Sequence, residues 1–170
     1  DYAVLGHTNG LETVTQEYGD SYKINAAEVY KDYGMYILFL AGLVYALVNL
    51  IISGVADLIR LVRKVPAKAP VDLKIWNYLT SLVILAVAFN FYLIFTALTT
   101  SQTAIVQPWR YMVFAGIGMI LAVSAVYPLV SKAKKRLGKG RLFLTGLTSL
   151  TALAIVANIL YWSLYQWWVL

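Results

Sequence analysis

The sequence lacks cysteine altogether and contains a single histidine, His7. Without cysteine the chain can form no disulfide, no thiolate metal site and no cysteine nucleophile. One histidine also excludes a haem held by two protein histidines, and any multi-histidine copper or iron site, within this chain. We therefore expect no metal and no cofactor, and we interpret His7 as a surface residue.

Recognisable catalytic motifs are also missing. No serine lies in a Gly-x-Ser-x-Gly elbow, and no glycine-rich phosphate loop precedes a helix. Carboxylates gather only near the N-terminus, where Glu12, Glu17 and Asp20 have a spacing that matches no calcium loop. We predict that the chain is not catalytic by itself; an enzyme with its active groups on this segment is the least favoured of three hypotheses.

Charged residues are scarce, at 13% of the chain, whereas 61% is hydrophobic. A soluble domain usually has about 25% charged and about 45–50% apolar residues, and one this small cannot bury such an excess. The apolar residues form four runs, each near or above the ~20 residues needed to cross a bilayer as a helix. The prediction is an all-α integral membrane protein, a four-transmembrane-helix antiparallel bundle with spans at about 35–59, 76–98, 111–130 and 142–165.

The basic residues predict the orientation of these spans. Of the 14 Lys and Arg residues, all but Lys23, Lys31 and Arg110 lie in the two connections around 60–74 and 132–141. Basic loops stay in the cytoplasm, so these two loops are predicted to be cytoplasmic and both termini to lie outside. This topology accounts for the net charge of +6 without a nucleic-acid partner.

Residues 1–34 are predicted to be an extracytoplasmic segment, followed by a transmembrane domain over 35–170. Glycines and polar residues punctuate the first half, which indicates a loop. Asn25 and Glu28 have the spacing of a capping box and predict a helix that begins near Ala26. The segment has too little apolar content for a core, so we expect it to be flexible or docked on another surface.

Between Met35 and Asp57, Trp76 and Leu98, Tyr111 and Val130, and Leu142 and Tyr165 the sequence contains no Asp, Glu, Lys, Arg or His. Proton relays and voltage sensors place ionisable groups there, so both are disfavoured. The notable polar residues that remain predict a cluster of interhelical hydrogen bonds or, alternatively, a pocket for a lipophilic ligand such as a lipid or quinone; they are Asn49, Asn90, Asn158, Tyr45 and Tyr92. Small residues four apart, such as Gly42 and Ala46, predict close helix contacts.

The second basic loop contains six cations and no acid: Lys132, Lys134, Lys135, Arg136, Lys139 and Arg141. Such a cluster could contact anionic lipid headgroups, but retention of the loop in the cytoplasm explains it without a ligand.

One functional hypothesis rests on the missing chemistry, on the uncharged spans and on the aromatic residues near the predicted outer ends of the spans, which are Tyr30, Tyr33, Tyr36, Trp109, Tyr111, Tyr161, Trp162, Tyr165, Trp167 and Trp168. The chain is expected to be a non-catalytic accessory subunit of a larger membrane protein complex, by analogy an energy-transducing or oxidoreductase complex, with membrane lipids and other membrane protein subunits as partners. The alternative is a small binding or transport protein for an uncharged or lipophilic molecule. The composition favours a prokaryotic source, and the expected location is the plasma membrane.

Overall fold

The structure is a computed structural model that describes residues 4–8, 11–16, 19–22, 26–66, 69–100 and 109–166, with side chains described within 27–66, 69–96 and 109–166. The chain forms two compact units, Asp1–Tyr36 and Ile37–Leu170. Each unit is described by itself below.

The first unit contains a three-stranded antiparallel sheet in the order β1-β2-β3, formed by Val4–Thr8, Leu11–Gln16 and Gly19–Tyr22. Thr8 pairs with Leu11, and Gln16 pairs with Gly19. The loop predicted for this stretch is therefore wrong over the three strands. The β-branched residues of Leu11–Gln16 favour a strand, and the two-residue Asn-Gly connection before it is a strong hairpin signal.

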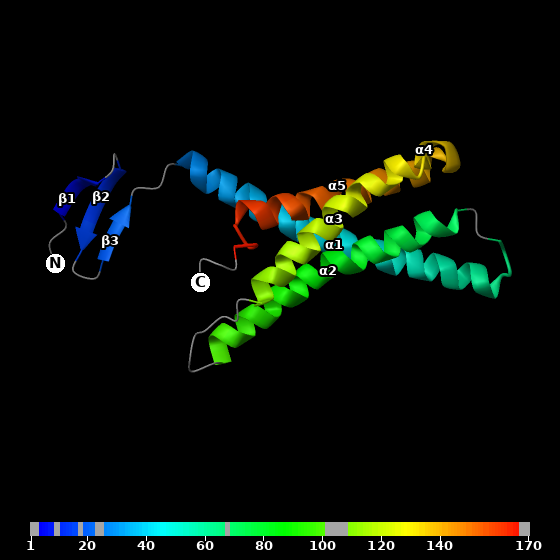
Figure 1. The fold of residues 1–170 in the computed structure, drawn as a ribbon, viewed down its shortest axis with the longest axis horizontal. Helices are drawn as coiled ribbons and strands as arrows, with labels where there is room; N and C mark the ends of the chain where they lie inside the picture. Colours follow the sequence, from blue (N-terminus) through cyan, green and yellow to red (C-terminus); the bar gives the residue numbers. More distant parts are fainter. Residues whose placement is uncertain are drawn as a thin grey trace. The chain divides into compact units, whose positions relative to one another are not determined.

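Four helices are long and apolar enough to cross a membrane, as the sequence predicted. They are α1 (Ala26–Val62), α2 (Val71–Thr100), α3 (Trp109–Val130) and α5 (Lys139–Tyr161) (Figure 1). The predicted start of α1 near Ala26 is confirmed. A short helix, α4 (Ala133–Arg136), forms within the second basic loop. Helix α5 ends before the predicted limit at Tyr165, and the turn that follows it places Ser163 at φ 52°.

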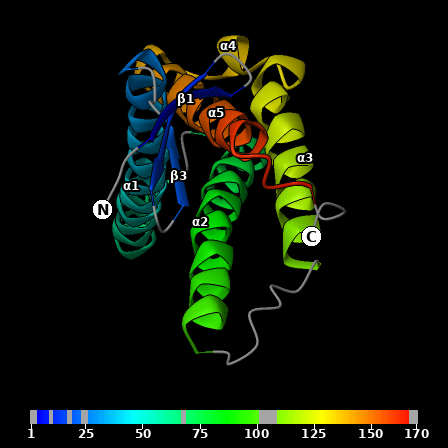
Figure 2. The same cartoon turned by 90° about the vertical axis from the view of Figure 1, so that its left-hand side faces the viewer.

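Helix α5 contacts α1, α2 and α3, and Figure 2 draws it between α1 and α3. The core is apolar and comes mainly from α2, α3 and α5. At its centre Phe114 is fully buried, with its ring centroid 4.8 Å from that of Phe91 and 6.5 Å from that of Tyr111. The buried apolar residues of this core are Ala46, Ile84, Val87, Ile94, Phe114, Ile117, Leu121, Ala125, Ala152, Ile155 and Ile159.

A proline within α3 joins that helix to α2. Pro128 has no N–H, so the carbonyl of Ser124, four residues earlier, lacks its usual intrahelical donor. The indole Nε1 of Trp76 donates to this carbonyl at 2.8 Å, and the Ser124 hydroxyl also bonds to that of Thr80. The Trp76 ring stacks on Tyr127 with 6.4 Å between centroids. Two side chains of α2, Trp76 and Thr80, thus bond to the carbonyl and the hydroxyl of Ser124.

Helix α1 meets the rest of its unit along a narrow stripe. Within residues 27–62 of this helix only Gly42, Ala46 and Asn49 are buried. Their spacings of four and three place them on one face. A Cβ added at Gly42 would lie 3.1 Å from Cδ1 of Ile155 and 3.3 Å from Cγ2 of Thr151. The predicted close helix contact is therefore confirmed at Gly42, against α5, and Ala46 on the same face is fully buried.

Candidate functional site

A network of neutral polar side chains joins α1, α2 and α5. Asn49 Nδ2 donates to Asn77 Oδ1 at 3.0 Å and to Ser81 Oγ at 2.9 Å. Thr148 Oγ1 lies 2.9 Å from the same Asn77 oxygen, and the Tyr45 hydroxyl lies 2.8 Å from Thr148 Oγ1. Each helix thus contributes at least one side chain, and Asn77 of α2 bonds to both neighbours. Because a buried amide is costly unless it is hydrogen-bonded, this network specifies how the three helices meet.

The network extends along α1 through Ser53, whose Oγ lies 3.5 Å from Asn77 Nδ2. Tyr45, Asn49 and Ser53 recur every four residues, which places them on one face of the helix. Asn77 and Ser81 have the same spacing on α2. One polar face of α1 therefore lies against one polar face of α2.

One turn beyond this network the contacts become ionic. The Asp57 carboxylate pairs with Lys74 Nζ at 2.6 Å and with Arg60 Nη1 at 3.4 Å, and it accepts a hydrogen bond from the Tyr78 hydroxyl at 2.7 Å. Arg60 lies one turn further along α1, whereas Lys74 and Tyr78 of α2 are the closer partners of this carboxylate. Asp57 therefore links the C-terminal part of α1 to the N-terminal part of α2.

These residues border a cavity of about 200 Å³. Helices α1, α2 and α5 all contribute to its wall, which combines charged and amide groups with apolar ones. Arg141, near the start of α5, lines the cavity, and its Nη1 atom is buried without a hydrogen-bond partner. The lining residues are Asn49, Ile52, Ser53, Ala56, Asp57, Arg60, Ala69, Leu73, Lys74, Asn77, Tyr78, Leu137, Arg141, Leu144 and Thr145.

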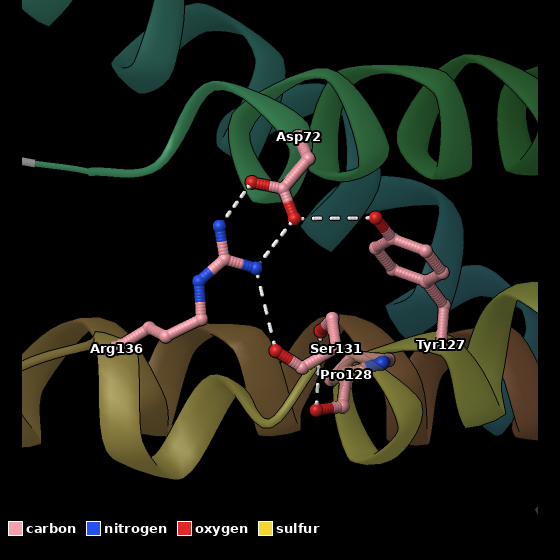
Figure 3. Close-up of polar contacts among 5 residues, drawn as sticks. All are labelled: Asp72, Tyr127, Pro128, Ser131 and Arg136. Atoms are coloured by element: carbon pink, nitrogen blue, oxygen red, sulfur yellow. Dashed lines mark hydrogen bonds and ion pairs between the residues drawn. The ribbon is translucent and has the colours of Figure 1, made fainter.

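A separate cluster at the start of α2 ties this helix to the second basic loop (Figure 3). The Arg136 guanidinium donates two hydrogen bonds to the Asp72 carboxylate, at 2.6 and 2.7 Å, and Tyr127 donates to it at 3.2 Å. Arg136 also donates to the backbone carbonyl of Ser131 at 3.3 Å. The hydrogen bond to Asp72 raises the pKa of Arg136 above its ordinary value. Bidentate arginine–carboxylate geometry gives this contact a defined orientation.

The structure brings together only two of the five polar residues singled out from the sequence, Tyr45 and Asn49. Asn90 instead donates to the carbonyl of Arg110 on α3 at 3.0 Å. Asn158 donates to Ala154 of its own helix at 3.0 Å, and its buried Oδ1 has no partner. Tyr92 is exposed on α2. The five residues therefore do not line one pocket.

The six cations of the second basic loop are also placed differently from one another. Arg136 is bound to Asp72, and Arg141 lines the cavity. The remaining four, Lys132, Lys134, Lys135 and Lys139, are exposed.

Four residues of these contacts were not predicted as site residues: Asn77, Ser81, Lys74 and Trp76. The recurrence of polar residues every four positions would have pointed to Asn77 and Ser81, because such spacing marks one helix face. Lys74 was used only to assign orientation, although a lysine flanking a span can also pair with a carboxylate of the preceding helix. Among the described residues no group of three or more His, Asp or Glu side chains could hold a metal ion.

No protein-family model, curated protein or solved structure matches this chain.

Proposed function

We propose that this chain is a non-catalytic accessory subunit of a larger membrane complex, and that α1 is the helix through which it joins its partners. The observation that carries the proposal is the asymmetry of α1. One narrow stripe of this helix faces its own unit, whereas large apolar side chains around the rest of its circumference are exposed. These include Val44, Leu47, Val48, Ile51, Ile52 and Val55.

Exposed apolar residues alone are expected of any helix that faces lipid. Helix α1 differs in that its buried stripe is made of small and amide residues, with no large apolar side chain buried among those described. Lipid provides no hydrophobic force between helices, so their association depends on close packing and hydrogen bonds. Gly54 lies on the exposed side, and a Cβ added there would meet nothing within 4 Å. This position offers a partner helix a close approach to the α1 backbone.

Isolation of the chain from its native membranes in mild detergent tests the proposal. Gly54→Phe should reduce the recovery of partner subunits, because the ring would hold a partner helix away from α1. Gly116→Phe, on α3, is the matched control, since that glycine also has nothing within 4 Å of an added Cβ. If the wild-type chain purifies alone and folded, or if both variants retain partners equally, the proposal is wrong. Identification of the recovered subunits tests the proposed host, an energy-transducing or oxidoreductase complex.

The proposed topology is an antiparallel bundle in the plasma membrane of a prokaryote, with both termini outside and both basic loops in the cytoplasm. The distribution of Lys and Arg supports it. Because the chain contains no cysteine, single cysteines introduced at exposed Lys134 and at exposed Tyr30 can be labelled without background. An impermeant maleimide should label Tyr30→Cys in intact cells, and Lys134→Cys only after permeabilisation. The reverse pattern would overturn the proposed orientation.

Binding of an uncharged lipophilic molecule is less favoured. The cavity at the network is lined by Asp57, Arg60, Lys74 and Arg141, and an uncharged ligand there would leave the buried Nη1 of Arg141 without an acceptor.

A further inference from the structure

The cavity between α1, α2 and α5 contains more positive charge than its one carboxylate can balance. Arg60, Lys74 and Arg141 line it, together with Asp57. Asp57 already accepts Lys74 Nζ at 2.6 Å, Tyr78 at 2.7 Å and Arg60 at 3.4 Å. Its oxygens are thus engaged by α1 and α2, and neither of them bonds to Arg141 of α5.

Of the three cations that line the cavity, Arg141 is the one that Asp57 does not bind. Its Nη1 atom is buried and has no hydrogen-bond partner. A buried charged donor without an acceptor is costly, whereas a planar guanidinium is well suited to bind an oxyanion through two parallel hydrogen bonds. The uncompensated donor therefore indicates an anionic ligand.

The cavity also has the size and the lining for such a ligand. A volume of about 200 Å³ exceeds several times the roughly 30 Å³ that one water occupies in the liquid. Asn77, Ser53 and Thr145 supply uncharged hydrogen-bonding groups, and Leu73 and Leu144 supply apolar surface. The basic residues flank the apolar spans, at the level where phospholipid headgroups lie.

We propose that this cavity binds a phosphate group, held by Arg141 together with the cationic ends of Arg60 and Lys74. The phosphate belongs either to a phospholipid headgroup or to a free phosphate in the cytosol. The site differs from a general attraction of the second basic loop to lipid, because two of its three cations come from α1 and α2.

Binding to the purified, delipidated full chain tests this proposal, with the rise in melting temperature measured by circular dichroism in detergent. Three probes are titrated: dioleoyl phosphatidylglycerol, dioleoylglycerol with the same acyl chains but no phosphate, and inorganic phosphate. Stabilisation by phosphatidylglycerol alone identifies a lipid headgroup, and stabilisation by inorganic phosphate identifies free phosphate. If neither phosphate probe stabilises the chain, or if dioleoylglycerol acts as well as phosphatidylglycerol, the proposal is wrong.

Variants then locate the site. Arg141→Gln should weaken binding about tenfold or more, the effect expected when a charge-assisted hydrogen bond is lost. Arg141→Lys, which keeps the charge but loses the planar fork, should retain part of the affinity. Lys134→Gln removes the same charge from an exposed position of the same loop and should change the affinity less than about twofold. Helix content without ligand shows whether each variant folds. Equal weakening by Arg141→Gln and Lys134→Gln would place binding on the loop surface and refute the site.

Discussion

The contact between Trp76 and Ser124 leads to a prediction of a loss of stability whose magnitude depends on a third residue, Pro128. Trp76 is 7% exposed, and its Nε1 donates to the Ser124 carbonyl at 2.8 Å. Trp76→Phe keeps an aromatic ring at this position but removes the donor. The carbonyl cannot turn to its own helix instead, because residue 128, which would donate to it, is proline. The substitution therefore leaves a part-buried acceptor without a donor, which costs about 1–3 kcal/mol, in addition to the packing lost with the smaller ring.

Pro128→Ala separates these two costs. It restores the backbone N–H that an α-helix directs at the carbonyl four residues earlier, so Ser124 no longer depends on Trp76. In the Pro128→Ala background, Trp76→Phe should lose only the packing contribution. The coupling between the two substitutions is thus expected to be about 1–3 kcal/mol.

The free energy of unfolding is measured for the wild type, the two single variants and the double variant. The unfolding is carried out in mixed micelles of a mild detergent and dodecyl sulfate and is followed by circular dichroism at the helical signal. Trp162→Phe is the matched control, because Trp162 is 45% exposed and should contribute little. If Trp76→Phe costs the same in both backgrounds, within the roughly 0.3–0.5 kcal/mol typical of independent sites, the role assigned to the proline is wrong.

Two further predictions concern how α1 is held. A double-mutant cycle of Asn49→Ala and Asn77→Ala should show a coupling of about 0.6–1.7 kcal/mol, the range measured for hydrogen bonds between membrane helices; additive effects in the same unfolding assay would contradict the network. Gly42→Val should destabilise the fold by about 1–3 kcal/mol, because its Cβ would lie 3.1 Å from Ile155 Cδ1, whereas Gly54→Val adds a side chain in open space and should stay within about 0.5 kcal/mol. Similar losses for the two valine variants would rule out a tight contact at Gly42.

The four helices could be predicted from the sequence because crossing a bilayer sets a minimum length of apolar residues that few other folds require. The start of α1 followed from a local signal, the spacing of Asn25 and Glu28. The end of α5 did not, because Trp162 and Tyr165 are aromatic residues of the kind that lie at a membrane interface, where a helix and a turn are both possible. The three strands were not predicted, because the glycine and polar residues of this stretch are also typical of loops and outnumber its one hairpin signal, the Asn-Gly pair.

The candidate site was predicted only in part. Asn49 and Tyr45 stood out because an amide or phenol within an apolar run is unusual. Asn77 was passed over because it lies near the end of its span, among other polar residues, although it accepts hydrogen bonds from two helices. Which residues meet across helices depends on their relative depth and rotation, and a single sequence carries no direct signal of either.

The contacts of α1, α2 and α3 have a common physical basis. In water the burial of large apolar side chains would drive these helices together, but in a bilayer the lipid is as apolar as the side chains and that driving force is absent. Directional contacts then decide which arrangement is preferred. Asn77 engages α1 and α5 together, and Trp76, its neighbour in sequence, engages α3 through Ser124. Consecutive residues of a helix point about 100° apart, so two adjacent side chains of α2 reach different neighbours and bond to three helices from a single turn. Asn77 and Leu73 of this turn also line the charged cavity. A ligand bound there would therefore contact the turn of α2 that bonds to α1, α3 and α5.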